Sequence, residues 1–322
     1  MESATKNKQT NEEIIKMVHK AFGNNLSSKD ITVKELTEGF FNVAYEVVLP
    51  GKAVILKIAP PIASNIMTYE HNMMQAEVTA LRLVREKTSV PVPEILYYDA
   101  SNSICNAEYF FMDKLEGDSF FKLKNDGMPE AEQKTIISEI GYYNAAMNQI
   151  FGTNFGYIGL SQKQGRSWKD TFLSMLSDVL KDGETIDISL GVEYDVVRKL
   201  IDKASFALEE LKNPVFVHWD LWDGNVFVKD GKITGLIDFE RALWGDPLME
   251  AYFRAHCYNE DFTLGYGADL RKEAPIRALL YDMYLYLIMV IETKYRLYPD
   301  DWQINFSKKE LQIAMESLNK LL

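Results

Sequence analysis

The segment 215–246 carries the polar residues best suited to catalysis in this 322-residue chain. It contains His218-x-Asp220-x-x-x-x-Asn225, followed after two apolar runs by an Ile-Asp-Phe-Glu segment that includes Asp238. Phosphoryl transfer requires a carboxylate that accepts or orients the proton of the acceptor hydroxyl, and oxygen ligands that hold Mg²⁺ against the nucleotide phosphates. Asp220 suits the first role, and the oxygens of Asn225 and Asp238 suit the second.

The two apolar runs between these residues are predicted to form a hairpin. They cover 226–229 and 233–237 and are separated by Asp230-Gly231, a common turn pair. Pairing of the runs would bring Asn225 and Asp238 close together. Asp and Asn before a hairpin also occur as ordinary turn residues, which is the alternative interpretation. The second acidic segment at the matching distance favours the catalytic interpretation.

A second charged residue stands out in the N-terminal third of the chain. Lys57 lies in the apolar run 54–58, where a charge requires a partner of opposite sign. A nucleotide site needs a cation for the phosphates and a carboxylate that holds this cation in place. Glu77, on the next predicted helix, is the first candidate for that carboxylate, and Glu70 is the second. The alternative is that Lys57 faces solvent from its strand.

The hydrophobic pattern predicts a small antiparallel sheet followed by a mostly helical region. Strands are expected at 31–37, 42–49, 53–58, 94–99 and 107–112, with helices at 12–22 and 69–86. Farther on, helices are expected near 130–150, 168–181, 193–211, 247–257, 271–297 and 308–322. The length exceeds what one hydrophobic core usually serves. We therefore predict an α+β fold of two lobes, residues 1–113 and 114–322.

These motifs resemble the aminoglycoside phosphotransferase family, within the bilobal protein-kinase-like fold that also includes choline and fructosamine kinases. The resemblance rests on the run from His218 to Asn225, on Ile-Asp-Phe-Glu at 237–240 and on Gly-Asp-Pro at 245–247. It implies that Asp220 is the catalytic base, that Asn225 and Asp238 bind Mg²⁺, and that His218 supports the loop. It further implies that Lys57, held by Glu77, binds the phosphates of ATP or GTP.

The resemblance extends to other nucleotide contacts. Gly39 and Asn42, in the turn between the first two strands, fit a Gly-x-x-Asn pattern of the family. A glycine lets the backbone approach a phosphate closely, and Asn42 would add a side-chain hydrogen bond. The segment from Asp113 to Leu115 resembles the hinge whose backbone receives adenine. Trp219 departs from the pattern, since many relatives have glycine there.

The net charge of −12 argues against a nucleic-acid partner, which would need a basic face. Most of it, −9, falls in residues 114–322, where the acceptor is expected to bind. We therefore predict a cationic hydroxylated acceptor, with a solvated acidic surface as an alternative of equal weight. The acidic residues expected at the acceptor wall are Asp182, Glu184, Asp187, Glu193 and Asp195.

The sequence predicts a cytoplasmic protein with no membrane partner. The first sixteen residues are polar and lack a signal core, and the apolar run 283–291 is too short to cross a bilayer. Cys105 and Cys257 lie far apart and are interpreted as reduced core residues.

The predicted function is that of a Mg²⁺-dependent small-molecule kinase. It would transfer the γ-phosphate of ATP or GTP to a hydroxyl of an aminoglycoside-like or other cationic compound. A kinase for a neutral sugar, an amino-alcohol or another metabolite is the alternative, as is a nucleotide-binding protein without catalysis. A protein kinase is disfavoured because the step from Asp238 to Gly245 is too short for an activation loop. Whether the role is antibiotic resistance or metabolism, and the oligomeric state, are left open.

Overall fold

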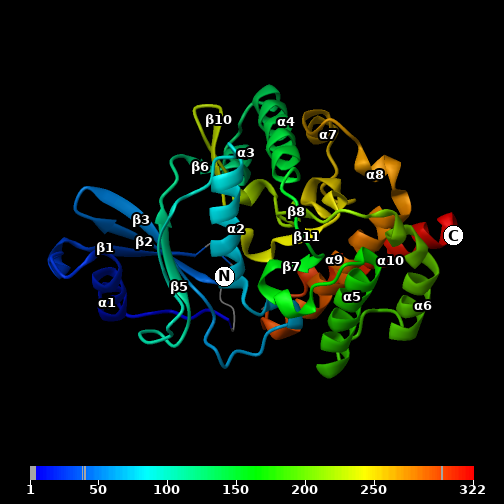
Figure 1. Cartoon of the computed structure of the whole chain (residues 1–322), viewed down its shortest axis with the longest axis horizontal. Coiled ribbons are helices and arrows are strands. Elements are labelled where there is room, and N and C mark those ends of the chain that lie inside the picture. The colour runs from blue at the N-terminus through cyan, green and yellow to red at the C-terminus, as the bar shows by residue number, and fades with distance from the viewer. Residues whose placement is uncertain (1–4, 38, 40, 299) are drawn as a thin grey trace.

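The computed structural model describes residues 5–37, 39, 41–298 and 300–322 (Figure 1). An antiparallel five-stranded sheet occupies the N-terminal third, in the order β1-β2-β3-β5-β4. Its strands are β1 (Thr32–Leu36), β2 (Val43–Leu49), β3 (Lys52–Ile58), β4 (Ile95–Asp99) and β5 (Tyr109–Asp113). This sheet confirms the five strands expected from the sequence.

Two helices cover the two faces of this sheet. Val54, Leu56 and Ile58 of β3 are buried in a cluster with residues of helix α1 (Asn11–Phe22). Because side chains alternate along a strand, Ile55 and Lys57 point to the opposite face. Residues of helix α2 (Met73–Lys87) pack on that face, against β5. Lys57 is therefore directed toward α2.

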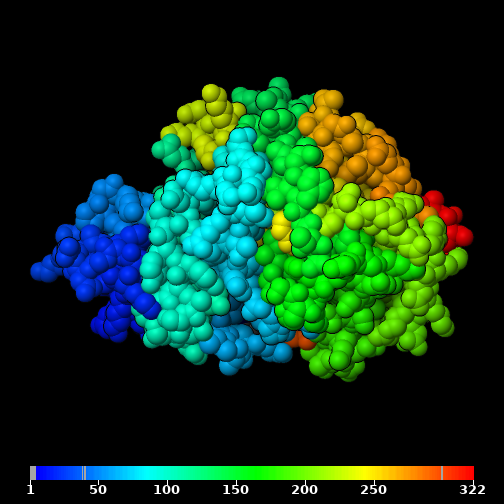
Figure 2. Space-filling view, in the orientation of Figure 1, coloured from blue at the N-terminus to red at the C-terminus, as the bar shows by residue number. Residues whose placement is uncertain are grey.

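The rest of the chain is mostly helical (Figure 1). On the face shown in Figure 2, α2 lies between the N-terminal sheet and these helices. The helices are α3 (Phe120–Asn125), α4 (Glu130–Met147), α5 (Trp168–Thr185), α6 (Tyr194–Ala204), α7 (Glu260–Tyr266), α8 (Leu270–Glu273), α9 (Pro275–Tyr295) and α10 (Trp302–Leu321). Two small sheets lie among them, ordered β10-β9-β6 and β7-β11-β8. Their strands are β6 (Asp118–Ser119), β7 (Gly156–Tyr157), β8 (Val215–Val217), β9 (Val226–Lys229), β10 (Lys232–Leu236) and β11 (Leu243–Gly245).

The largest hydrophobic core surrounds α9, whose side chains are buried along most of its length. A helix that is apolar on all sides in this way belongs in the interior of a fold. Among the described residues, no helix is both long enough and apolar enough to cross a membrane. Cys105 is buried and Cys257 half-buried, and both are free thiols.

The structure confirms the α+β class and corrects two predicted helices. The helix expected at 69–86 begins only at Met73, because Asn72 adopts a left-handed conformation with φ 61°. The helix expected at 247–257 is wrong. Two 3-10 turns, Pro247–Met249 and Ala251–Phe253, are separated there by the extended backbone of Glu250. The division of the chain into lobes at residue 113 stays a prediction.

Candidate active site

The segment after β8 is held in place by the buried ring of His218. Its Nδ1 accepts a hydrogen bond from the backbone N–H of Asp220 at 3.2 Å. An accepting Nδ1 places the proton on Nε2, which donates to the carbonyl oxygen of Ile237 at 3.0 Å. The ring thus joins the Asp220 loop to the end of β10. The supporting role expected of His218 stays a prediction, and these two hydrogen bonds are the contacts it would use.

A single buried carboxylate organises the backbone of the same loop. Glu250 accepts hydrogen bonds from the backbone N–H of Trp219 at 3.1 Å and of Leu221 at 3.0 Å. It also accepts from the Asn144 side chain and from the N–H of Ala251. Its fully buried charge is offset by these four donors. The extended backbone that breaks the predicted helix is what lets Glu250 reach the loop.

Trp219 follows His218 with a left-handed backbone, φ 74°. Its buried indole lies between two guanidinium groups, Arg241 at 5.1 Å and Arg254 at 4.5 Å from the ring centroid. Arg254 also donates a hydrogen bond to the carbonyl of Trp219. The left-handed backbone explains why glycine suits this position in relatives. In this chain, packing of the indole compensates for the absence of glycine.

The hairpin β9–β10 brings the two expected metal ligands together. Its turn uses positive φ at both Asp230 and Gly231, as predicted from the sequence. Beyond the hairpin, the N–H of Ile237 donates to the carbonyl of Asn225 at 3.0 Å. The side-chain NH₂ of Asn225 donates to the carbonyl of Asp220 at 2.9 Å. That bond fixes the orientation of the amide, and the ligand role of its oxygen stays a prediction.

Lys57 lies among three carboxylates at the centre of the site. Its Nζ is 2.6 Å from Glu77, 2.5 Å from Asp238 and 3.4 Å from Glu240. The predicted Lys57–Glu77 pair is thus present, and Lys57 does not face solvent. Asp238 reaches it from a left-handed backbone, φ 68°, at the end of β10. Glu70, the second candidate, instead binds Arg296 at 2.5 Å.

The carboxylates around Lys57 have strongly altered proton affinities. Burial raises the pKa of Glu77 to about 7 despite the lysine beside it. Burial and the neighbouring charge of Asp238 raise the pKa of Glu240 to about 8. Asp238 stays ionised, because Lys57 outweighs burial and lowers its pKa. Burial opposes the charge of Lys57, but the three carboxylates hold its pKa well above the usual value.

This carboxylate group fits a divalent cation. Oxygens of Glu77, Asp238 and Glu240 lie within 4.8 Å of one another, and Oε1 of Glu77 is buried without a partner among the described residues. The three acids outnumber the lysine, and burial, followed by the charge of Asp238, raises the pKa of Glu77 and of Glu240. A hard cation such as Mg²⁺ prefers these oxygen donors and would supply the missing positive charge.

The same carboxylates lie in a pocket of about 580 Å³. Eight of the sequence-predicted site residues line it: Gly39, Asn42, Lys57, Glu77, Asp113, Leu115, Asp220 and Asp238. Asn225 and His218 do not line it, and both are buried behind the loop. The volume is in the range of small-molecule sites. Residues far apart in the sequence therefore form one cavity.

The predicted nucleotide contacts lie at the pocket wall. The Asn42 side chain donates to Glu240 at 2.5 Å, and its Oδ1 is buried without a partner among the described residues. Asn42 thus anchors the loop between β1 and β2 to the carboxylate group. At the hinge, the backbone N–H of Asp113 already donates to the carbonyl of Glu94. The roles assigned to Gly39, Asn42, Asp113 and Leu115 stay predictions.

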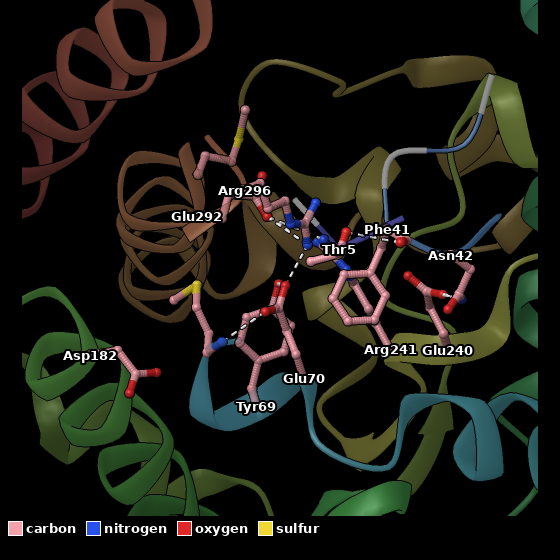
Figure 3. A network of polar contacts seen from close by, with 12 residues as sticks. Thr5, Phe41, Asn42, Tyr69, Glu70, Asp182, Glu240, Arg241, Glu292 and Arg296 are labelled. Carbon is pink, nitrogen blue, oxygen red and sulfur yellow. Dashed lines mark hydrogen bonds and ion pairs between the residues drawn. The ribbon is translucent and has the colours of Figure 1, made fainter. Parts of the chain in front are cut away.

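Sequence reasoning missed a group of residues at the far end of the pocket. Arg241, Glu292, Arg296, Tyr298 and Gln303 line it together with Asp220. Arg296 binds Glu292 as well as Glu70, and its guanidinium lies 5.2 Å from the ring of Phe41 (Figure 3). Four of these five residues come from the region around the end of α9 and the start of α10, where the sequence showed no motif. Glu240 entered the sequence analysis only as the last residue of the Ile-Asp-Phe-Glu motif, and the structure places its carboxylate 3.4 Å from Lys57.

The acidic stretch expected at the acceptor wall does not line this pocket, and its role at the acceptor stays a prediction. The described residues that line the pocket include none from 181 to 195. Asp182 accepts hydrogen bonds from the backbone and side chain of Thr68, both at 2.7 Å. Glu184 and Asp195 both bind Arg198 at the surface. These acids serve local structure in this arrangement.

Comparison with known proteins gives a consistent family. A family model described as the phosphotransferase enzyme family matches residues 32–281. An aminoglycoside 3'-phosphotransferase from Enterococcus faecalis is 35% identical over 89 residues, 27% of this chain and 33% of that protein. A methylthioribose kinase from Exiguobacterium sibiricum is 26% identical over 236 residues, 68% of this chain and 59% of that protein. The chain thus matches a third and about three fifths of the lengths of these two relatives.

Solved structures show the same fold. A protein assigned as a fructosamine-3-kinase from Haemophilus somnus 129PT superposes with a TM-score of 0.68 at 17% identity, covering 94% of this chain and 97% of that one. A thermostable mutant of an aminoglycoside phosphotransferase, in ternary complex with ADP and hygromycin B, gives 0.65 at 18% identity, covering 96% and 99%. The fold is therefore kinase-like. Since the family model covers more than half of the sequence, the chain belongs to the phosphotransferase enzyme family.

Proposed function

We propose that the protein is a kinase that transfers the γ-phosphate of ATP or GTP to a hydroxyl group of a small-molecule acceptor in the cytoplasm. The observation that carries this proposal is that Lys57, its carboxylate partners and Asp220 all line the same pocket. Phosphoryl transfer depends on positioning and charge stabilisation, which this arrangement provides. Support for a nucleotide comes from the related phosphotransferase structure that contains ADP.

Each group that lines the pocket or lies behind its loop has a task in this proposal. Asp220, held by His218 and Glu250, accepts the proton of the acceptor hydroxyl at its carboxylate. Lys57, held by Glu77, binds the phosphates. Asn225 and Asp238 would hold Mg²⁺, which neutralises phosphate charge when bound. The backbone of 113–115 would receive the base of the nucleotide.

Substitution of Asp220 tests the proposal. Asp220→Asn should lower turnover at least a thousandfold, because it removes the proton acceptor while keeping the loop. Nucleotide affinity, measured by calorimetry, should change less than threefold. Asp230→Asn, in the β9–β10 turn, is the matched control, because Asn also tolerates positive φ, and it should keep full activity. Activity of Asp220→Asn near that of the wild type would contradict the assignment.

Asp238→Asn should act on the nucleotide. It removes a carboxylate from the proposed metal site. The apparent affinity for MgATP, measured from its thermal stabilisation of the protein, should therefore fall at least tenfold. An unchanged titration would remove Asp238 from the metal site.

A cationic, aminoglycoside-like acceptor is the candidate that the match to an aminoglycoside phosphotransferase favours. The longer match to a methylthioribose kinase favours a neutral sugar. A phosphorylation panel of aminoglycosides, amino-alcohols and neutral sugars distinguishes the two classes.

A further inference from the structure

Two arginines, Arg241 and Arg296, line the same pocket as Asp220. Arg296 is almost fully buried and binds two carboxylates, Glu70 at 2.5 Å and Glu292 at 3.1 Å. Figure 3 shows these contacts converging on its guanidinium. The charge of Arg296 is therefore already balanced by the protein.

Arg241 is not balanced in the same way. Its side chain makes one hydrogen bond within the described part of the chain, from Nη2 to Glu292 at a long 3.4 Å. Glu292 is shared with Arg296 and also accepts a bond from Gln303 at 2.7 Å. The Nε of Arg241 is buried without a partner among those same residues. A guanidinium offers five N–H donors, so most of the hydrogen-bonding capacity of Arg241 is unused.

The surroundings of Arg241 hold it rigidly at the pocket. Its guanidinium lies 5.5 Å from the centroid of Tyr69 and 5.1 Å from that of Trp219. Burial would lower its pKa, but Tyr69, Asp220 and Glu292 hold that pKa well above the usual value. Arg241 is thus a fixed cation whose environment includes the charge of Asp220.

We propose that the acceptor carries a carboxylate or similar oxyanion, and that Arg241 binds this group while Asp220 engages the hydroxyl to be phosphorylated. A planar guanidinium pairs with a carboxylate through two parallel hydrogen bonds, which orients the acceptor as well as binding it. A polyamine would instead face a buried guanidinium of the same charge. This inference rests on the proposed kinase function and replaces the cationic and neutral acceptor candidates given above with hydroxy acids.

Matched acceptors of one carbon skeleton test the inference. D-gluconate, D-glucitol and D-glucamine carry a carboxylate, a neutral hydroxymethyl and an ammonium group at the same position, and glycerate, glycerol and 3-amino-1,2-propanediol repeat the series at smaller size. With MgATP, we expect kcat/KM for the carboxylates to exceed that of the neutral members at least tenfold and that of the amines at least a hundredfold. Equal or better use of the amines would overturn the inference but would still support the kinase function.

Substitution of Arg241 identifies the residue responsible. Arg241→Gln should raise KM for the preferred carboxylate at least tenfold while changing KM for MgATP and for the neutral member less than twofold. Arg241→Lys should recover part of the loss, because charge returns without the planar fork. Arg198→Gln, a surface arginine paired with Glu184, is the control and should change neither KM. An equal rise in KM for MgATP would assign Arg241 to the nucleotide and overturn the inference.

Binding provides a readout that does not depend on turnover. In the presence of Mg²⁺ and a non-hydrolysable ATP analogue, D-gluconate or glycerate should raise the melting temperature of the wild type, and the amines should not. This difference in the wild-type protein also tests the preference for a carboxylate-bearing acceptor if Arg241→Gln fails to fold. Lack of stabilisation by both carboxylates would overturn the inference, whereas the Asp220→Asn comparison with other acceptors tests the kinase function separately.

Discussion

Trp219 combines an unfavourable backbone with favourable packing. A left-handed φ costs a non-glycine residue about 1–2 kcal/mol. Removing a buried indole costs about 3–5 kcal/mol. Trp219→Gly should therefore lower the free energy of unfolding by about 1–4 kcal/mol in urea titrations. Trp302→Gly, at a largely exposed side chain in the first turn of α10, is the comparison and should cost at most about 1 kcal/mol. A Trp219→Gly variant as stable as the wild type would contradict this balance.

Glu240 makes the stability of the metal-free protein depend on pH. Because burial raises its pKa to about 8, the folded state keeps a proton that the unfolded state releases near its ordinary value of 4.5. The folded state therefore binds more protons between these values, and its stability falls as pH rises. Glu240→Gln removes this group. In EDTA, the free energy of unfolding of the variant minus that of the wild type should therefore increase from pH 5 to pH 8. A relative stability that falls over this range would contradict the assignment.

At the scale of elements, the loop after β8 depends on Glu250. Its carboxylate accepts three backbone N–H bonds and one from Asn144. Hydrogen bonds to a buried charge are worth about 1.5–3 kcal/mol each, so Glu250→Gln should cost at least about 2 kcal/mol. The loop should also loosen, with kcat falling more than tenfold. Glu260→Gln, in the exposed first turn of α7, should change neither value. Full activity of Glu250→Gln would show that the loop keeps its shape without this charge.

Elements with local signals were predictable from the sequence, and those set by distant contacts were not. Asp230-Gly231 specifies the β9–β10 turn by its own backbone preferences, so the joining of Asn225 and Asp238 followed directly. Alternation along β3 set the direction of Lys57 in the same way. The interruption at Glu250 could not be predicted, because its cause is the loop more than twenty residues earlier that its carboxylate binds.

At the scale of the whole molecule, Arg296 joins the connector before α2 to the end of α9. It binds Glu70, 226 positions away, and both side chains are almost fully buried. Removing one partner of a buried pair leaves an unpaired charge and costs about 3–5 kcal/mol. Arg296→Met should show this loss in chemical unfolding. The double variant Glu70→Gln/Arg296→Met should recover at least half of the lost free energy of unfolding. A loss in the double variant equal to the sum of the losses in the two single variants would exclude coupling.

Contacts of this range also limit what the sequence could reveal about the acceptor. Bulk charge indicated an acidic wall, yet Asp182 binds Thr68, and Glu184 and Asp195 bind Arg198, all outside the pocket. Charge composition carries no information on which side chains share a cavity. The arginines that do share the pocket with Asp220 meet through tertiary packing alone.

The origin of the pocket wall has an evolutionary consequence. The groups proposed for phosphate transfer lie within 32–281, the span of the family match, whereas Glu292, Arg296 and Gln303 lie beyond it. The side chains that share the pocket with Asp220 thus come partly from within that span, as Arg241 does, and partly from beyond it, as Arg296 does. Exchange of the region 292–303 between relatives would then be a route to new acceptor specificity, because it changes part of the pocket wall and leaves the residues proposed for phosphate transfer unchanged.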